Sequence, residues 1–169
     1  MTQRVLVAYG TRNGSTAGIA EAIGDALRAQ GMEAQVRPAA EVEDVTSYDL
    51  VVVGGALYMG RWHVDAVRFA RRHRSELLNR AVWLFSSGPL DPSAGERDIP
   101  PVRGVRRAMI RLDAREHRTF GGRLEKGARG RMARTIVESG RGGDFRDFDA
   151  ISAWATALAA KPVAAVPLR

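Results

Sequence analysis

The sequence contains no cysteine, which excludes a disulfide scaffold, a catalytic thiol and any zinc site built on thiolate ligands. Its three histidines, His63, His73 and His117, lie far apart in the chain, so no metal site is expected. No apolar run approaches the ~18 residues of a membrane-spanning helix. The N-terminus leads directly into a strand-like stretch and lacks the layout of a signal peptide. We therefore expect a cytoplasmic protein without a transmembrane segment.

Lysine is almost absent, because only Lys126 and Lys161 among the 26 basic residues are lysines. The formal net charge of +7 is unevenly distributed: residues 61–134 carry 18 basic and eight acidic side chains, whereas residues 1–60 carry four and seven. A basic surface attracts anionic or acidic partners, but a charge run without interleaved aromatic residues is often only a solvated face. We expect an anionic or acidic partner at residues 61–134, with the solvated face as the alternative, and no specific nucleic acid.

The length of 169 residues, with 45% hydrophobic and 27% charged side chains, is typical of one globular domain. We expect this domain to cover residues 1–161 and a C-terminal tail to cover residues 162–169, with fraying from Lys161 onward.

Short apolar runs alternate with amphipathic stretches along the chain. Strands are expected over Arg4–Tyr9, Glu33–Arg37, Asp49–Gly54, Ala81–Phe85 and Arg115–Gly121, and helices over Ser15–Gln30, Val64–His73, Val102–Leu112 and Asp147–Ala160. Gly31 is expected to stop the first helix. Strands that are apolar on both faces must be covered on both, and their alternation with helices predicts a parallel sheet. The expected fold is a three-layer α/β domain of five strands.

Two segments are expected to form loops: Ser86–Arg103, which contains two glycines and four prolines, and Gly121–Asp144, which contains many glycines and arginines. Within the second, Met132, Ile136 and Val137 alternate with arginines at a spacing that would also suit a short amphipathic surface helix. A solvated helix or loop is the favoured interpretation, because the apolar face is small.

Ligands of open parallel sheets bind beyond the carboxyl ends of the strands, which directs attention to the loops Gly10–Thr16, Gly54–His63 and Ser86–Leu90. The first loop opens a helix, and the free N–H groups of a helix N-terminus hold phosphate well. Four side chains able to donate hydrogen bonds surround Gly14 there: Thr11, Asn13, Ser15 and Thr16. Neither Gly-Lys-Ser/Thr nor Gly-x-Gly-x-x-Gly occurs, so the loop suits a terminal monophosphate. The alternative is that a hydroxyl simply caps the helix.

Three stretches carry a resemblance to a known family: Thr11-Arg12-Asn13-Gly14-Ser15-Thr16, Gly55-Ala56-Leu57-Tyr58-Met59-Gly60-Arg61-Trp62-His63, and Phe148–Ala155. They resemble the flavodoxin superfamily, and within it the branch of menaquinone-dependent protoporphyrinogen oxidases. The resemblance implies a flavodoxin-like fold with a five-stranded parallel sheet in the order 2-1-3-4-5. It also implies FMN as the cofactor.

The resemblance assigns the FMN phosphate to the first loop and the isoalloxazine ring to the space between the second and third loops. The implied contacts are Thr11, Arg12, Asn13, Gly14, Ser15 and Thr16 for the phosphate, and Ala56, Leu57, Tyr58, Met59, Gly60, Ser87, Gly88, Pro89 and Leu90 for the ring, with Trp62 as an alternative to Leu57. No catalytic acid or base is expected from the protein, because the flavin carries the redox chemistry. His63 is expected to cap or pack at the helix that follows it.

These expectations favour an FMN-dependent oxidoreductase or electron-transfer protein that exchanges electrons with a redox partner protein or a quinone. One alternative is a menaquinone-dependent protoporphyrinogen IX dehydrogenase of haem biosynthesis at the inner face of the membrane, in which Arg61, Arg97 or Arg103 would meet the substrate's carboxylates. The other is a flavin-free binding module on the same scaffold, since a fold does not fix a function.

Overall fold

The computed structural model describes residues 2–124, 130–138, 140 and 142–163. Six strands form the main sheet: β1 (Arg4–Gly10), β2 (Glu33–Pro38), β3 (Leu50–Tyr58), β4 (Arg61–Trp62), β5 (Ala81–Ser87) and β6 (Glu116–Phe120). The helices around it are α1 (Ser15–Ala29), α2 (Val64–Arg72), α3 (Arg74–Leu77), α5 (Arg103–Leu112) and α7 (Phe148–Ala159). The remaining elements are the 3-10 turn η1 (Ala39–Glu41), α4 (Ser93–Glu96), α6 (Arg131–Glu138) and the strands β7 (Arg123–Leu124) and β8 (Gly143–Asp144).

The sheet has the order β2-β1-β3-β5-β6, and all four pairings along this path are parallel. This is the order 2-1-3-4-5 that the resemblance implies, because β5 and β6 are the fourth and fifth parallel strands in sequence. In the central register, Val52 of β3 lies between Val7 of β1 and Trp83 of β5. The carboxyl ends of β1, β3 and β5 therefore meet at one edge of the sheet.

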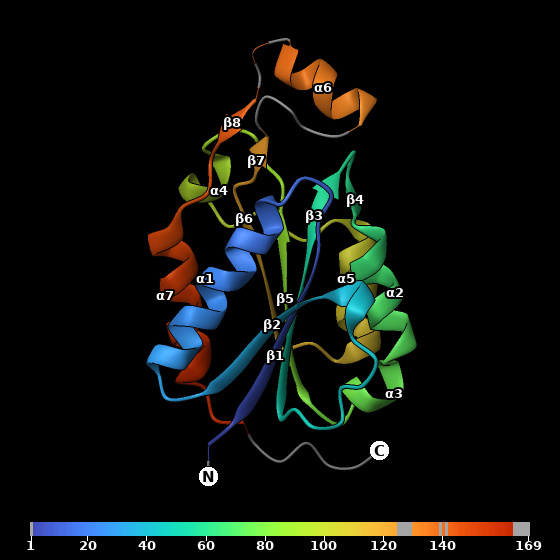
Figure 1. The fold of residues 1–169 in the computed structure, drawn as a ribbon, viewed down its shortest axis with the longest axis vertical. Coiled ribbons are helices and arrows are strands. Elements are labelled where there is room, and N and C mark those ends of the chain that lie inside the picture. Colours follow the sequence, from blue (N-terminus) through green and yellow to red (C-terminus); the bar gives the residue numbers. More distant parts are fainter. Residues whose placement is uncertain (1, 125–129, 139, 141, 164–169) are drawn as a thin grey trace.

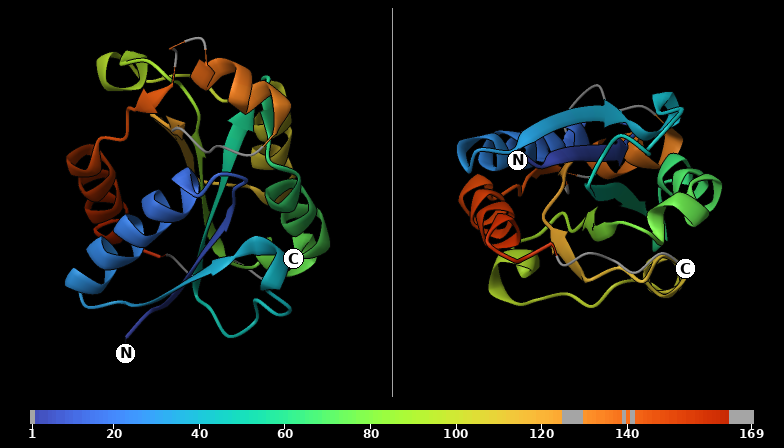
Figure 2. Two further views of the ribbon diagram at one scale, coloured as in Figure 1. Left: turned by 45° about the horizontal axis from the view of Figure 1, so that its top comes forward. Right: turned by 90° about the horizontal axis from the view of Figure 1, so that it is seen from below.

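Helices cover both faces of the sheet, with α1 and α7 on one side and α2, α3 and α5 on the other (Figure 1 and Figure 2). Alternate strand residues supply the two cores. Val5, Val7, Val52, Trp83 and Phe85 pack under α1 and α7. The intervening residues, Leu6, Ala8, Val51, Val53 and Leu84, pack under the helices of the opposite face. The three-layer α/β fold is confirmed.

Several boundaries differ from the sequence-based expectation. β3 continues past Gly54 to Tyr58 and turns back as β4, so part of the expected second loop is a β-hairpin. The two segments expected to form loops also contain short elements: α4 lies in Ser86–Arg103, and β7, α6 and β8 lie in Gly121–Asp144. The stop of α1 agrees with expectation, since Gly31 adopts φ 86° just after the helix.

The C-terminal end is anchored further than expected. Lys161 pairs with Glu116, and the carbonyl of Pro162 accepts a 3.0 Å hydrogen bond from Nη1 of Arg115. Val163 packs against the core under α1 and α7. Fraying therefore does not begin at Lys161, while the rest of the expected tail, residues 164–169, lies outside the described residues. Over the described ranges, no helix combines the length and apolarity needed to cross a lipid bilayer.

A buried histidine lies at the edge of the sheet. His117 of β6 is 8% exposed, and its Nε2 is 2.9 Å from Oγ of Ser86 on β5. Burial lowers the pKa of His117 to about 4, against the weaker opposing effect of the Asp98 carboxylate. Burial also lowers the pKa of His73, which caps the end of α2. Both rings are therefore neutral in the folded protein near neutral pH.

Gly54 packs directly against Phe85, so we expect Gly54→Ala to lower the free energy of unfolding. An added Cβ would overlap the Phe85 ring, which is fully buried and packs against Phe120 and Trp154. The expected loss of unfolding free energy is about 3 kcal/mol, the scale of severe overpacking. Urea denaturation measures it. Gly104→Ala is the matched control, because nothing lies within 4 Å of its added Cβ, and an equal loss there would contradict the steric explanation.

The buried histidines predict a loss of stability in mild acid. The unfolded chain takes up a proton at each imidazole near pH 6.5, whereas folded His117 does so only near pH 4. Unfolding free energy should therefore be highest above pH 6.5 and fall as the pH drops toward 4, by up to about 3 kcal/mol for His117. Urea denaturation at a series of pH values tests this. His117→Gln should flatten the dependence, and an unchanged slope in that variant would refute the assignment.

Candidate functional site

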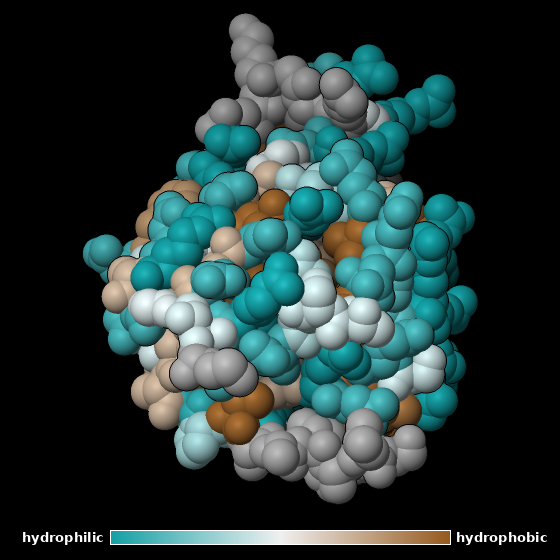
Figure 3. Space-filling view, turned by 60° about the horizontal axis from the view of Figure 1, so that its bottom comes forward, coloured by the Kyte–Doolittle hydropathy of each residue, from teal (hydrophilic) through white to brown (hydrophobic). Residues whose placement is uncertain are grey.

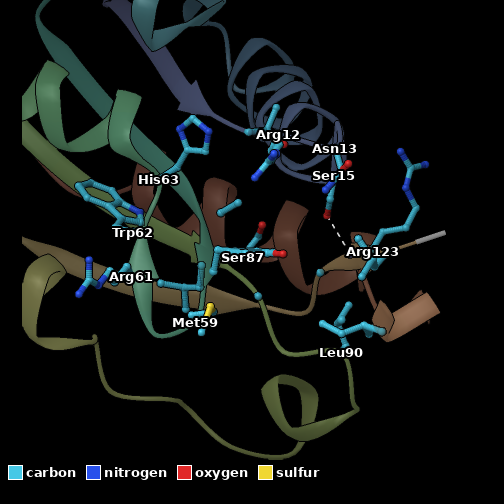
Figure 4. A pocket seen from close by; sticks show the side chains of 18 of the residues that line it. Arg12, Asn13, Ser15, Met59, Arg61, Trp62, His63, Ser87, Leu90 and Arg123 are labelled. Carbon is cyan, nitrogen blue, oxygen red and sulfur yellow. Dashed lines mark hydrogen bonds between the residues drawn. The ribbon is translucent and has the colours of Figure 1, made fainter. Parts of the chain in front are cut away.

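A cavity of about 480 Å³ opens at the carboxyl ends of β1, β3 and β5. Its size lies within the range of small-molecule sites, roughly 300–1,000 Å³. Figure 4 shows side chains from several separate segments around it, including Arg12, Met59, Ser87 and Arg123. This is the sheet edge at which ligands of open α/β folds bind.

The turn before α1 presents a helix N-terminus to this region. Gly14 is the N-terminal cap residue and adopts φ 83°, a left-handed conformation that glycine tolerates best. Oγ1 of Thr11 accepts a 3.1 Å hydrogen bond from the Gly14 N–H, which closes the turn. No side-chain hydrogen bond caps α1. Its first-turn N–H groups and its positive dipole end thus remain able to receive an anion.

The hydroxyls of this turn have two different roles. Oγ1 of Thr16 is fully buried and lies 2.8 Å from Oγ of Ser87, so Thr16 ties α1 to the end of β5. Ser15 lines the cavity, and its Oγ accepts a 2.9 Å hydrogen bond from the Arg123 N–H. The hydroxyl proton of Ser15 is left to donate toward a ligand. Neither residue is the helix cap, so the capping alternative does not account for them.

Two guanidinium groups flank the turn. The Arg123 side chain lies beside it, since a Cβ added to Gly14 would be 3.7 Å from Arg123 Nη2. The Arg12 side chain lies against Gly130, where an added Cβ would be 2.9 Å from Arg12 Cζ. Both arginines line the cavity (Figure 4). Arginine thus places positive charge beside this turn, as a lysine does in the phosphate-binding loops of the Gly-Lys-Ser/Thr type.

The second wall is the hairpin of β3 and β4. Tyr58 pairs with Arg61 across a two-residue turn in which Met59 has φ 50° and Gly60 has φ 73°. Two positive φ angles are typical of a type I′ turn. Met59 is 74% exposed, so the turn holds an apolar side chain at the rim of the cavity at some cost in backbone strain.

Trp62 and His63 complete this wall. Nε1 of Trp62 donates a 3.3 Å hydrogen bond to the carbonyl of Phe85, which fixes the indole between β4 and β5. Nδ1 of His63 accepts a 3.1 Å hydrogen bond from the Asp65 N–H. His63 therefore caps α2, as expected from the sequence.

The third wall is held by hydrogen bonds between two loops. The Gly88 N–H donates to the Phe120 carbonyl at 3.1 Å, and the Gly122 N–H donates to the Pro89 carbonyl at 3.0 Å. These bonds bring Gly122, Arg123 and Leu124 to the cavity, and Ile136 of α6 reaches it as well. The short helix considered for this segment is present at Arg131–Glu138.

Most of the sequence-predicted site residues meet at this cavity. It is lined by Thr11, Arg12, Asn13, Ser15, Ala56, Leu57, Tyr58, Met59, Ser87, Gly88 and Leu90, but not by Gly14, Thr16, Gly60 or Pro89. Arg61 lines it and Arg97 and Arg103 do not. Sequence reasoning missed Val64, Gly122, Arg123, Leu124 and Ile136 as residues of the site. For those after β6, the nearest signal in the sequence is the Gly121-Gly122 pair that follows this strand.

The arrangement suits a flat, amphiphilic ligand with a terminal anionic group. Leu57, Tyr58, Met59 and Leu90 offer apolar and aromatic surface, and the turn before α1 offers donors. The buried hydroxyl of Tyr58 has no hydrogen-bond partner within the described ranges. An unsatisfied buried hydroxyl costs about 1–3 kcal/mol, which a polar atom of a ligand would offset.

The chain is similar to a curated enzyme over part of its length. It is 29% identical over 109 residues to the protoporphyrinogen IX dehydrogenase [quinone] of Escherichia coli strain K12, and the same enzyme of two other Escherichia coli strains matches equally. The aligned region covers 63% of this chain and 60% of the enzyme. The chain thus spans about three fifths of the length of these relatives.

Solved structures show the same fold. A flavodoxin from the domain Archaea superposes with a TM-score of 0.61 at 12% identity, covering 92% of this chain and 96% of the archaeal one. The Streptococcus pneumoniae TIGR4 flavodoxin gives 0.60 at 16% identity, covering 94% and 99%.

The family model described as "Flavodoxin domain" matches residues 6–142, which include β1 from Leu6 onward, the other four parallel strands and every residue that lines the cavity. A match to the flavodoxin domain implies a flavin cofactor. The chain belongs to the flavodoxin domain family.

Proposed function

We propose that this chain binds FMN in the cavity at the carboxyl edge of the sheet and acts as an oxidoreductase or electron-transfer protein. The observation that carries the proposal is the opening of the uncapped α1 N-terminus beside the apolar wall of the β3–β4 hairpin. A phosphate requires the first surface, and a fused aromatic ring system requires the second. The family membership, which implies a flavin, supports the same reading.

Different residues would bind the phosphate and the ring of FMN. The N–H groups of the turn after Thr11, the Ser15 hydroxyl and the Arg123 guanidinium would hold the phosphate. Tyr58 and Met59 would contact the ring on one side and Gly88 and Leu90 on the other. FMN, when bound, supplies the capacity to accept and release one or two electrons. The protein orients it and limits access of water, and a redox partner protein or a quinone would exchange electrons with it.

Protoporphyrinogen IX oxidation with a quinone is a second candidate. The relative from Escherichia coli supports it, together with the arginines at the cavity, Arg12, Arg61 and Arg123. Guanidinium groups bind carboxylates in a bidentate manner, and porphyrinogen carries carboxylates. Porphyrin formation, followed by its fluorescence with menaquinone present, tests the candidate. If the FMN-loaded protein forms no porphyrin with any quinone, then protoporphyrinogen oxidation is excluded and the electron-transfer role is retained.

Gly14→Val is expected to abolish flavin retention. A β-branched residue strains the φ of 83° at this position, and its side chain would lie between the turn and Arg123. The measurement is the visible flavin absorbance and FMN content of the purified variant beside wild type. A wild-type protein that binds no FMN on titration would instead favour the flavin-free binding module.

Ser15→Ala removes a single donor and should weaken FMN binding by about 1–2 kcal/mol, a five- to thirtyfold change in dissociation constant. Quenching of flavin fluorescence on titration measures this constant. Ser75→Ala provides the control, because Ser75 is exposed and its hydroxyl donates a hydrogen bond to the neighbouring Glu76 carboxylate, away from the cavity. Equal affinities of the two variants would show that the phosphate is held elsewhere.

A further inference from the structure

A second, smaller hollow lies between α2 and α5, behind the hairpin wall of the main cavity. Its volume is about 100 Å³. The residues that line it come from both helices and from β4: Trp62, Val67, Ala70, Arg71, Gly104, Arg107, Ala108 and Arg111. The two helices lie side by side on this flank of the sheet (Figure 1). We refer to this feature as the arginine-rimmed hollow.

The floor of the arginine-rimmed hollow is apolar. Trp62 is 5% exposed, and Ala70 of α2 and Ala108 of α5 are similarly buried. Small alanine side chains and the glycine at position 104 leave the space open between the helices. The result is a concave apolar surface, which an inserted apolar side chain would remove from water.

The rim is cationic. Arg71, Arg107 and Arg111 are exposed, and none of them forms an ion pair with any described residue. No acidic residue lines the hollow. The nearest carboxylate in sequence on α2, Asp65, lies in the first turn of the helix, 3.8 Å from His63 Nδ1. Three like charges at one rim repel one another, and an anionic partner relieves that repulsion.

The surrounding surface extends this charge. Further exposed arginines, Arg68, Arg72, Arg103 and Arg106, belong to the same two helices. In Figure 3 the flank of α2 and α3 is hydrophilic, whereas tan and brown residues gather on the opposite flank over α1 and α7. The charge complement of this surface is therefore acidic. Its concave apolar feature is the hollow, in addition to the exposed side chains of Val64 and Ile110 on the same two helices.

The size and shape of the hollow select the class of partner. At about 100 Å³ it is well below the roughly 300 Å³ of a typical small-molecule site, and it suits one apolar side chain. A lipid surface offers no protruding group to fill a hollow, and a phosphate backbone would leave the apolar floor without contact. An acidic protein segment offers both an apolar side chain and carboxylates that match guanidinium groups.

We propose that the arginine-rimmed hollow docks an acidic segment of a partner protein. One apolar side chain of the segment occupies the hollow against Trp62, and flanking carboxylates pair with Arg71, Arg107 and Arg111. This docking does not depend on the flavin, so it stands or falls separately from the proposed function.

Fluorescence anisotropy with labelled acidic peptides tests the docking. The probes are dodecapeptides of aspartate and glutamate with one central Leu, Ile, Met, Phe or Trp, and a matched peptide with central Ser. We expect the best apolar peptide to bind about fivefold or more tightly than the Ser peptide, because only the former fills the hollow. Binding of the whole panel no tighter than the Ser peptide would overturn the proposal.

Two variants separate the hollow from general electrostatic attraction. Gly104→Leu keeps the charge and is tolerated, since nothing lies within 4 Å of its added Cβ, yet it occupies the hollow. It and Arg107→Glu should each weaken the best peptide about tenfold. Arg37→Glu removes an exposed arginine of β2, remote from the hollow, and should change the affinity less than about twofold. Thermal unfolding confirms that each variant is folded.

A competition experiment tests whether a membrane or a nucleic acid, and not an acidic protein segment, binds at the hollow. Vesicles of anionic phosphatidylglycerol and a short DNA duplex are added to the peptide complex. If the vesicles or the DNA displace the peptide, and if they bind wild type and Gly104→Leu equally well, then the partner of this surface is a membrane or a nucleic acid and not an acidic segment. Equal weakening by Arg37→Glu and Arg107→Glu would likewise refute a defined docking site. Failure of FMN to bind would leave all of these results unchanged.

Discussion

The free N–H groups at the start of α1 impose the constraint around which the carboxyl edge of the sheet is organised. The N–H groups of a helix N-terminus need hydrogen-bond acceptors, and here the cap position is a glycine, which has no side-chain acceptor. Thr11 closes the turn and Thr16 anchors the helix to Ser87, so these hydroxyls stabilise the turn. An anion placed at this N-terminus would satisfy both the N–H groups and the helix dipole, which is the basis of the proposed phosphate contact.

Elements that depend on local pattern follow well from the sequence. The apolar runs through Val5–Val7 and Val51–Val53, the stripe of α1 and the stop at Gly31 predict the elements and both cores, whereas the strand order came from the family resemblance. The hairpin tip does not follow, because a methionine at positive φ contradicts local propensity and is held by the pairing of Tyr58 with Arg61. Tertiary context decides this position.

The site shows the same division. The first loop and most of the second and third reach the cavity, since parallel strands place their carboxyl ends together. Arg123 could not be assigned in advance, because it is placed by the backbone hydrogen bonds from Gly88 to Phe120 and from Gly122 to Pro89, which no sequence motif encodes. Ile136 reaches the cavity from α6, a separate element. Thr16 has a role that the motif alone does not reveal: its hydroxyl lies against Ser87 and ties α1 to β5, while its contact with a ligand stays a prediction.

Trp62 joins the two surfaces on which the basic charge of the chain is concentrated. Its indole lines both the main cavity and the arginine-rimmed hollow, and its hydrogen bond to Phe85 fixes it in the wall between them. A buried aromatic side chain in a close-packed wall moves only together with its neighbours. The fixed indole thus gives each surface a rigid apolar wall, while the other residues that line the two surfaces come from different segments.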